Sequence, residues 1–95
     1  MDRVRLIPSA ARAAANRKRS KAQQLDDLLD SHLSSVNNYS DFWDGLTFNR
    51  FVERYHQRDR IFRFMTQSLR LQADELDMVA REKEESDRRL QDALR

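Results

Sequence analysis

The chain has 95 residues, of which 36% are charged, with one glycine, one proline and no cysteine. Eighteen basic residues nearly balance sixteen acidic ones, for a formal net charge of +2, and such a balance is not typical of a nucleic-acid-binding protein. The lack of cysteine excludes disulfides and thiolate metal sites. The scarcity of glycine and proline favours long helices over strands joined by tight turns. The composition therefore predicts one small all-α domain, near the length at which a single chain struggles to bury enough surface.

No segment of the sequence is typical of a membrane span or a signal peptide. Residues 1–7 lack the apolar core of a secretory signal, and no apolar run approaches the ~20 residues that cross a bilayer. We therefore expect no stable membrane insertion. If the protein leaves the cell, we expect it to do so without a cleaved signal peptide.

A first helix is predicted from about residue 8 to residue 37. Pro8 suits the first helical position, because its missing N–H has no helical partner there in any case. Apolar residues then recur at spacings of three, four and seven, which places them on one face of a helix. The members of this stripe that we expect to form core or dimer contacts are Leu25, Leu29 and Val36.

A turn is predicted at about residues 38–46, where asparagine, serine, aspartate and glycine are concentrated. A second helix is predicted from about residue 47 to residue 80, because apolar residues again alternate spacings of three and four. The stripe of this helix that we expect to form core or dimer contacts is Phe48, Phe51, Tyr55, Phe62, Met65, Leu69 and Leu76. The stripe fails beyond residue 80, so residues 81–95 are predicted to form a charged helical tail that can be mobile.

Two amphipathic helices joined by one turn form an antiparallel hairpin, which has only one inner face. We therefore expect the domain, residues 1–95, to dimerise into a four-helix bundle that covers the remaining apolar surface. Arg58 interrupts the second stripe, and two readings of it stay open. It forms a contact with Asp26, within the chain or across a dimer, or it lies at the edge of the stripe and reaches water.

The tripeptide Trp43-Asp44-Gly45 stands between the two predicted helices. Gly45 tolerates the backbone angles of a reversal, and Trp43 is large enough to cover the end of a two-helix core. This motif, the two helices, the chain length and Asp87 near the C-terminus together resemble the WXG-hundred family, the early-secreted-antigen-like small proteins of type VII secretion systems. The resemblance covers nearly the whole chain and also includes Pro8, Phe51, Phe64, Leu69, Leu76 and Ala80.

The resemblance implies a helical hairpin with the Trp-x-Gly motif in its turn, paired as a homodimer or as a heterodimer with a related WXG-like protein. It implies recognition by the type VII export ATPase and secretion from the cytoplasm, as a substrate or as an escort subunit. Trp43 and Gly45 would then lie beside the C-terminal tail of the partner, and the two together would form the export signal.

The main departure from the family pattern lies in the tail. The tail motif of the family reads Tyr-x-x-x-Asp or Glu, and the matching stretch here has Asp87 but Lys83 in place of the aromatic residue. Three readings follow. The partner supplies the complete motif, the chain tolerates a variant signal, or the chain is not exported.

Residues suited to catalysis or metal binding are few. The histidines are His32 and His56, and a chain with one glycine has no phosphate-binding loop. Glu53 and His56 match half of a di-iron motif, but both fall off the apolar stripe and the first helix contains no glutamate. We therefore predict no enzymatic activity, no metal and no cofactor.

Two alternatives to a secretion protein remain. One is a cytoplasmic coiled-coil-like scaffold in which the Trp-x-Gly tripeptide is coincidental. The other is a nucleic-acid-binding helical protein that uses the basic clusters at residues 12–21 and 50–63 for phosphate contacts. The acidic run at residues 74–87 nearly cancels these clusters, so we expect no nucleic-acid partner.

Overall fold

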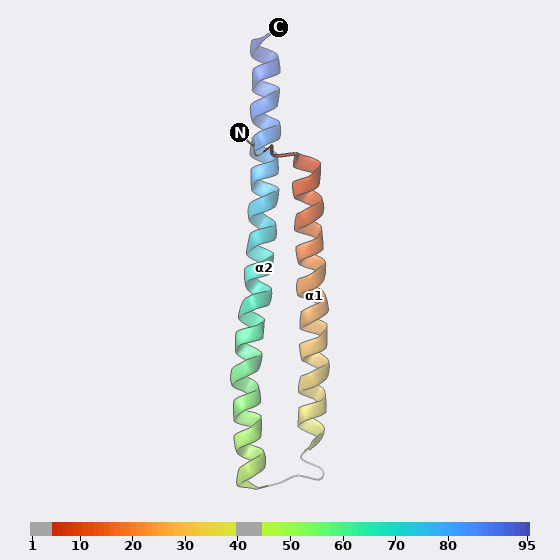
Figure 1. Ribbon diagram of the computed structural model, residues 1–95, viewed down its shortest axis with the longest axis vertical. Helices are drawn as coiled ribbons and strands as arrows, with labels where there is room; N and C mark the ends of the chain where they lie inside the picture. Colours follow the sequence, from red (N-terminus) through yellow and green to blue (C-terminus); the bar gives the residue numbers. More distant parts are fainter. Residues whose placement is uncertain (1–4, 40–44) are drawn as a thin grey trace. The chain divides into compact units, whose positions relative to one another are not determined.

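The computed structural model describes residues 5–39 and 45–95 of the chain (Figure 1). Two helices account for nearly all of them: α1 spans Pro8–Asn38 and α2 spans Leu46–Ala93. The described residues contain no strand, which confirms the predicted all-α helical hairpin. Residues 81–93, which lie in the predicted helical tail, belong to α2 without interruption.

The helix starts follow from local chemistry. In α1, the Ala11 N–H donates to the Ile7 carbonyl at 3.0 Å, so Pro8 lies in the first turn, where its lack of an N–H costs nothing. In α2, the Asn49 N–H donates to the Gly45 carbonyl at 3.1 Å. Gly45 has a φ of +90°, a backbone conformation that residues with a Cβ rarely adopt. The single glycine of the chain therefore stands where the chain enters α2.

The chain forms two compact units, which we call the end unit and the turn unit. The end unit consists of Met1–Ser20 and Leu69–Arg95, and the turn unit of Lys21–Ser68. A stretch of α1 lies antiparallel to a stretch of α2 in each of them. In the end unit Arg12 pairs with Glu84 while Arg19 pairs with Asp77, so residue numbers rise along one helix and fall along the other.

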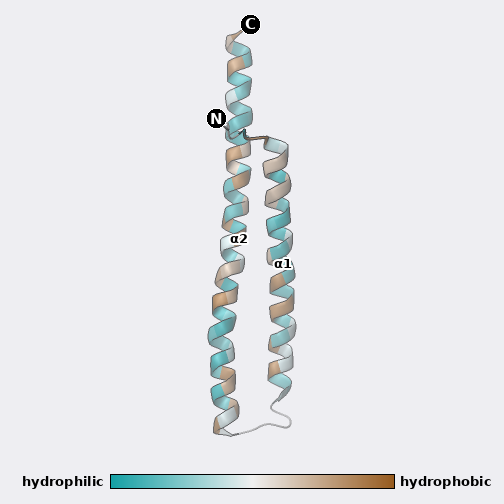
Figure 2. Ribbon diagram, in the orientation of Figure 1, coloured by the Kyte–Doolittle hydropathy of each residue, from teal (hydrophilic) through white to brown (hydrophobic). Residues whose placement is uncertain are grey.

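The seam between the helices is lined by small side chains. The buried core residues of the end unit are all alanines, namely Ala11, Ala15, Ala73 and Ala80. The turn unit buries Ala22, Leu29, Val36 and Thr66. Because small residues let two helices approach closely, the larger apolar side chains are left beside the seam. Figure 2 shows apolar residues recurring among hydrophilic ones along both helices, as expected of amphipathic helices.

Candidate interaction faces

One flank of the seam is closed by ion pairs, and we call it the ion-paired flank. In the end unit the Arg12 guanidinium forms a two-pronged contact with the Glu84 carboxylate, with Nη2 to Oε2 at 3.0 Å. Arg19 Nη2 lies 2.9 Å from Asp74 Oδ1 and 2.6 Å from Asp77 Oδ2. The hydrogen bond from Arg12 lowers the pKa of the Glu84 carboxyl below its usual value. The charges of this flank are therefore engaged within the chain.

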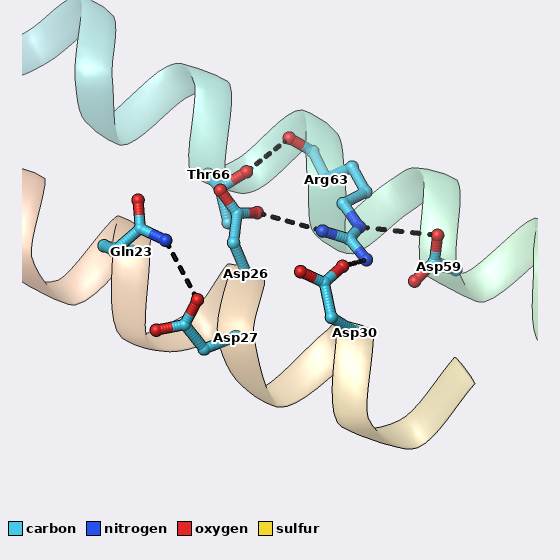
Figure 3. A network of polar contacts seen from close by, with 7 residues as sticks. All are labelled: Gln23, Asp26, Asp27, Asp30, Asp59, Arg63 and Thr66. Atoms are coloured by element: carbon cyan, nitrogen blue, oxygen red, sulfur yellow. Dashed lines mark hydrogen bonds and ion pairs between the residues drawn. The ribbon is translucent and has the colours of Figure 1, made fainter. Parts of the chain in front are cut away.

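In the turn unit the ion-paired flank is centred on Arg63 (Figure 3). Its guanidinium lies 2.7 Å from Asp30 Oδ1, 3.4 Å from Asp26 Oδ1 and 3.5 Å from Asp59 Oδ2. The Thr66 hydroxyl donates to the Arg63 carbonyl oxygen at 2.8 Å, one turn along the same helix. Asp26 and Asp59 are only 17% and 15% exposed, so the single guanidinium compensates two largely desolvated carboxylates. Asp26 thus pairs with Arg63, whereas Arg58 lines the groove on the other flank.

The sequence contains aspartates four residues apart in α1 and the pair Asp59 and Arg63 in α2, but it does not indicate that these residues form one cluster. Their spacing places each set on one helix face. The spacing does not determine how the two helices are aligned. It is this alignment that brings the aspartates of α1 and the Asp59–Arg63 pair of α2 to the same flank.

The opposite flank of the seam is apolar and uncovered, and we call it the open flank. In the turn unit it holds a groove of about 380 Å³ lined by Leu25, Leu28, Leu29, His32, Tyr55, Arg58, Asp59 and Phe62. Leu28 and Phe62 are 54% and 43% exposed. A smaller groove of about 170 Å³ adjoins it, lined by Phe51, Arg54, Tyr55 and Arg58. Large apolar side chains from both helices therefore meet here without being covered.

Two polar atoms of this groove have no hydrogen-bond partner within the part of the chain that the structure describes. They are the Tyr55 hydroxyl and Asp59 Oδ1, and both are shielded from water. Burial, reinforced by the negative charge of Asp59, raises the pKa of the Tyr55 hydroxyl. The Tyr55 hydroxyl can donate a hydrogen bond, and Asp59 Oδ1 can accept one.

The end unit, taken by itself, also has an open flank with an apolar groove. A groove of about 330 Å³ is lined by Lys18, Gln72, Glu75, Leu76 and Val79. The Lys18 ammonium donates to Gln72 Oε1 at 2.9 Å, and Val79 is 43% exposed. The Gln72 side chain of α2 is therefore hydrogen-bonded to α1.

The structure divides the predicted stripe between the seam and the open flank. Leu29 and Val36 are buried, whereas Phe62 and Met65 are 43% and 52% exposed. The remaining members are half-buried, namely Leu25, Phe48, Phe51, Tyr55, Leu69 and Leu76. The row of α2 that faces α1 most directly contains Thr66, Ala73 and Ala80, seven residues apart and beside the predicted stripe. The predicted stripe thus lies partly in the seam between the helices and partly on the open flank.

The residues predicted to form the export signal are described only in part. Gly45 is described, but Trp43 lies outside the described residues. Near the C-terminus the Lys83 ammonium pairs with Asp87 Oδ1 at 2.8 Å across one turn of α2. The position that holds the aromatic residue in the family here holds a cation that is bound to the acidic residue of the same motif.

The described residues contain no group of three or more histidine, aspartate or glutamate side chains placed to hold a metal ion. Neither α1 nor α2, over the same described ranges, contains a stretch long and apolar enough to cross a membrane.

Comparison with known proteins agrees with this architecture. The sequence profile of the WXG100 family, described as proteins of 100 residues with WXG, matches residues 3–88. Six chains of known structure match the fold. One is EsxA of Geobacillus thermodenitrificans in crystal form I, with a TM-score of 0.80 and 19% identity over 93% of this chain and 96% of that chain. No curated protein sequence matches significantly. Because the family profile spans most of the sequence, the chain belongs to the WXG100 family, the small helical proteins of type VII secretion systems.

Proposed function

We propose that this chain is a non-enzymatic component of a type VII secretion system that acts by pairing with a second WXG-like hairpin. The observation that carries the proposal is the open flank, where both helices leave large apolar side chains exposed beside the seam. Contiguous exposed apolar surface marks sites of protein association. A second hairpin laid on this flank would convert the two-helix unit into a four-helix bundle with an ordinary core.

In this proposal the pair is the exported species. The chain contributes the Trp43-Asp44-Gly45 half of the export signal, and the partner contributes a C-terminal tail with the aromatic residue that Lys83 replaces here. The pair leaves the cytoplasm through the export ATPase without a cleaved signal peptide, as a substrate or as the escort of a larger one.

The test of pairing uses matched substitutions two residues apart on α2. Phe62→Glu places a charge on the open flank, whereas Phe64→Glu places the same charge at a phenylalanine that is 70% exposed and away from both flanks. The mass of each variant is measured by light scattering, alone and mixed with a WXG-like protein from the same source. We expect Phe62→Glu to abolish pairing and Phe64→Glu to preserve it. A wild-type chain that stays monomeric alone and in the mixture would refute the proposal.

Export is tested separately, in cells that contain a type VII system. Trp43→Ala should leave pairing intact but abolish both secretion and co-purification with the export ATPase. Secretion of this variant at the wild-type level would show that the Trp-x-Gly turn is not part of the signal.

A further inference from the structure

A second set of large apolar side chains lies on the side of α2 that faces away from α1. Thr66 and Ala73 are buried in the seam, and a residue two positions before or after them lies about 200° around the helix. Because α2 is one uninterrupted helix, residues at these positions share its outer side. We call this side the outer face. Its large apolar residues are 62%, 70%, 64% and 57% exposed, and they are Ile61, Phe64, Leu71 and Met78.

The outer face is separate from the open flank. The open-flank grooves are lined by other residues of α2, and a second hairpin laid on that flank would leave the outer face in water. Over the described length of α1 the exposed large apolar side chain is Leu28, which lines the open-flank groove. The outer face of α2 therefore has no counterpart on α1, and contiguous exposed apolar surface marks a site of association.

The outer face has the spacing of a coiled-coil seam. Phe64, Leu71 and Met78 are seven residues apart, and Ile61 precedes Phe64 by three. These are the intervals between the core positions of a heptad, whose side chains interlock with those of another helix. Ser68 lies between Phe64 and Leu71, and its small side chain leaves room for a large one from the opposite helix. The outer face is therefore shaped to be covered by a helix.

The exposed charges beside the outer face are arranged to fit a second copy of α2. When two copies lie antiparallel with Gln67 of one beside Gln67 of the other, Arg60 of each copy lies opposite Asp74 of the other. Glu53 of each copy then lies opposite Arg81 of the other. Each contact occurs twice because the arrangement is two-fold symmetric. These side chains are all exposed, and Asp74 remains 66% exposed beside its ion pair within the chain.

The same alignment brings the apolar side chains of the two outer faces together. Ile61 of each copy meets Leu71 of the other, and Phe64 of each copy lies against Ser68 of the other. One alignment thus satisfies both the apolar residues and the charges that flank them.

Other alignments place like charges together. Sliding one copy by seven residues brings Arg60 opposite Arg81 in one direction and Glu53 opposite Asp74 in the other. Two parallel copies in register bring Glu75 against Glu75 in the centre of the contact. Like charges across an interface are unfavourable and exclude wrong registers. The charges therefore favour the antiparallel contact centred on Gln67.

We infer that the outer face of α2 binds the outer face of a second copy of the chain, antiparallel and with Gln67 at the two-fold axis. The contact uses neither flank of the seam, so it goes beyond the proposed pairing and does not compete with it. A chain that binds a WXG-like hairpin through its open flank keeps its outer face for this contact. Two pairs would then join into an assembly of four chains.

A single introduced thiol tests the contact, because the chain has no cysteine of its own. Gln67 is exposed, and Gln67→Cys lies beside its own copy in the inferred alignment. The purified full chain is treated with a short bismaleimide, and we expect a covalent two-chain product. The matched control is Gln24→Cys, at an exposed position of α1 two residues from the buried Ala22, which should give at most about a tenth of that yield. Equal yields from the two variants would overturn the inference.

Charge reversal tests the alignment. Glu53→Arg and Arg81→Glu each place like charges opposite each other in the inferred contact, although they change the net charge in opposite directions. Each should weaken self-association in sedimentation experiments about threefold or more, and the double variant should restore it. A double variant that associates no better than the single ones would overturn the alignment. Far-UV circular dichroism checks that each variant is helical.

The remaining outcomes distinguish this inference from the proposed function. Pairing through the open flank without a Gln67→Cys product would refute the outer-face contact and leave the proposed function standing. The Gln67→Cys product in a chain that does not pair with any WXG-like protein would support the contact and refute the pairing. If Gln67→Cys gives no product and neutral phosphatidylcholine vesicles bind the wild type but not Phe64→Glu, the outer face binds lipid and the inference is refuted.

Discussion

The alanine-lined seam makes a prediction in which a more hydrophobic side chain destabilises the protein. Ala15 is fully buried between the helices of the end unit. If space were available there, the three added carbons of Ala15→Leu would stabilise the fold by roughly 0.8 kcal/mol each. Because the site is already filled by close approach of the helices, we expect instead a loss of about 1–3 kcal/mol, the usual cost of overpacking. In a domain of this size that corresponds to a decrease in Tm of about 5–20 °C.

Ala13→Leu is the matched control, since Ala13 is exposed on the same helix two residues away. Alanine and leucine have similar helix propensities, so this change should shift stability by no more than about 0.5 kcal/mol. Both variants are melted at one protein concentration by circular dichroism, because pairing makes Tm depend on concentration. An Ala15→Leu protein as stable as Ala13→Leu would show that the helices do not approach closely at this position.

Three further predictions concern the entry to α2 and two titrating groups. Gly45→Ala should lower the free energy of unfolding, measured in urea, by about 1–2 kcal/mol, because φ at this position is +90° and nothing lies within 4 Å of an added Cβ. Gly45→Asn should lower it less. Equal stability of the wild type and both variants would contradict the left-handed conformation. The pKa of Glu84 is lowered by Arg12, so its contribution to stability is present above the ordinary carboxyl value of ~4.3 and disappears as pH falls through the lower folded value. Glu84→Gln should therefore melt below wild type at neutral pH and together with it in strong acid, and a pH-independent difference would contradict the pair. The pKa of Tyr55 is raised by burial, so ultraviolet titration of the wild type should show tyrosinate absorbance appearing above the ordinary pH of ~10, and Tyr55→Phe should remove that phase. The contribution of Tyr55 to stability is complete below pH ~10 and is lost as the pH rises through the raised pKa of the folded protein. A wild-type titration without the late phase would contradict the burial of the Tyr55 hydroxyl.

The helices themselves could be predicted because local rules determine them. One proline at the start of α1 and one glycine before α2 mark the two points where a helix can begin most easily, and the apolar period leaves no competing strand. The facing of the helices could not be predicted in the same way. Periodicity gives weight to large apolar side chains, whereas the row that faces α1 contains Thr66, Ala73 and Ala80, which a hydrophobicity pattern ranks low.

The partners of the charged residues could not be predicted either, because they also depend on how the helices face each other. Arg58 and Arg63 are both basic residues of α2, and the sequence offers no local reason to pair Asp26 with one or the other. That choice depends on which row of α2 faces α1, since rotation of α2 by one row would exchange the flanks of the two arginines. Once Thr66 lies in the seam, Arg63 is brought to the aspartates and Arg58 to the open flank. The ion pairs of Arg63 and the exposure of Arg58 thus both follow from the orientation of α2 that places Thr66 in the seam.

The orientation of α2 that places Thr66 in the seam also links stability to pairing. The end unit buries four alanines, and each contributes only about the transfer free energy of a methyl group, while every ordered residue costs roughly 1–2 kcal/mol of backbone entropy. The larger side chains needed to offset that cost, such as Leu76 and Val79, lie on the open flank, where a single hairpin covers them only in part. In the proposed pair, a second hairpin would cover them. The residues that complete the core would then be the ones that the second chain contacts, so folding to full stability and pairing would become one step.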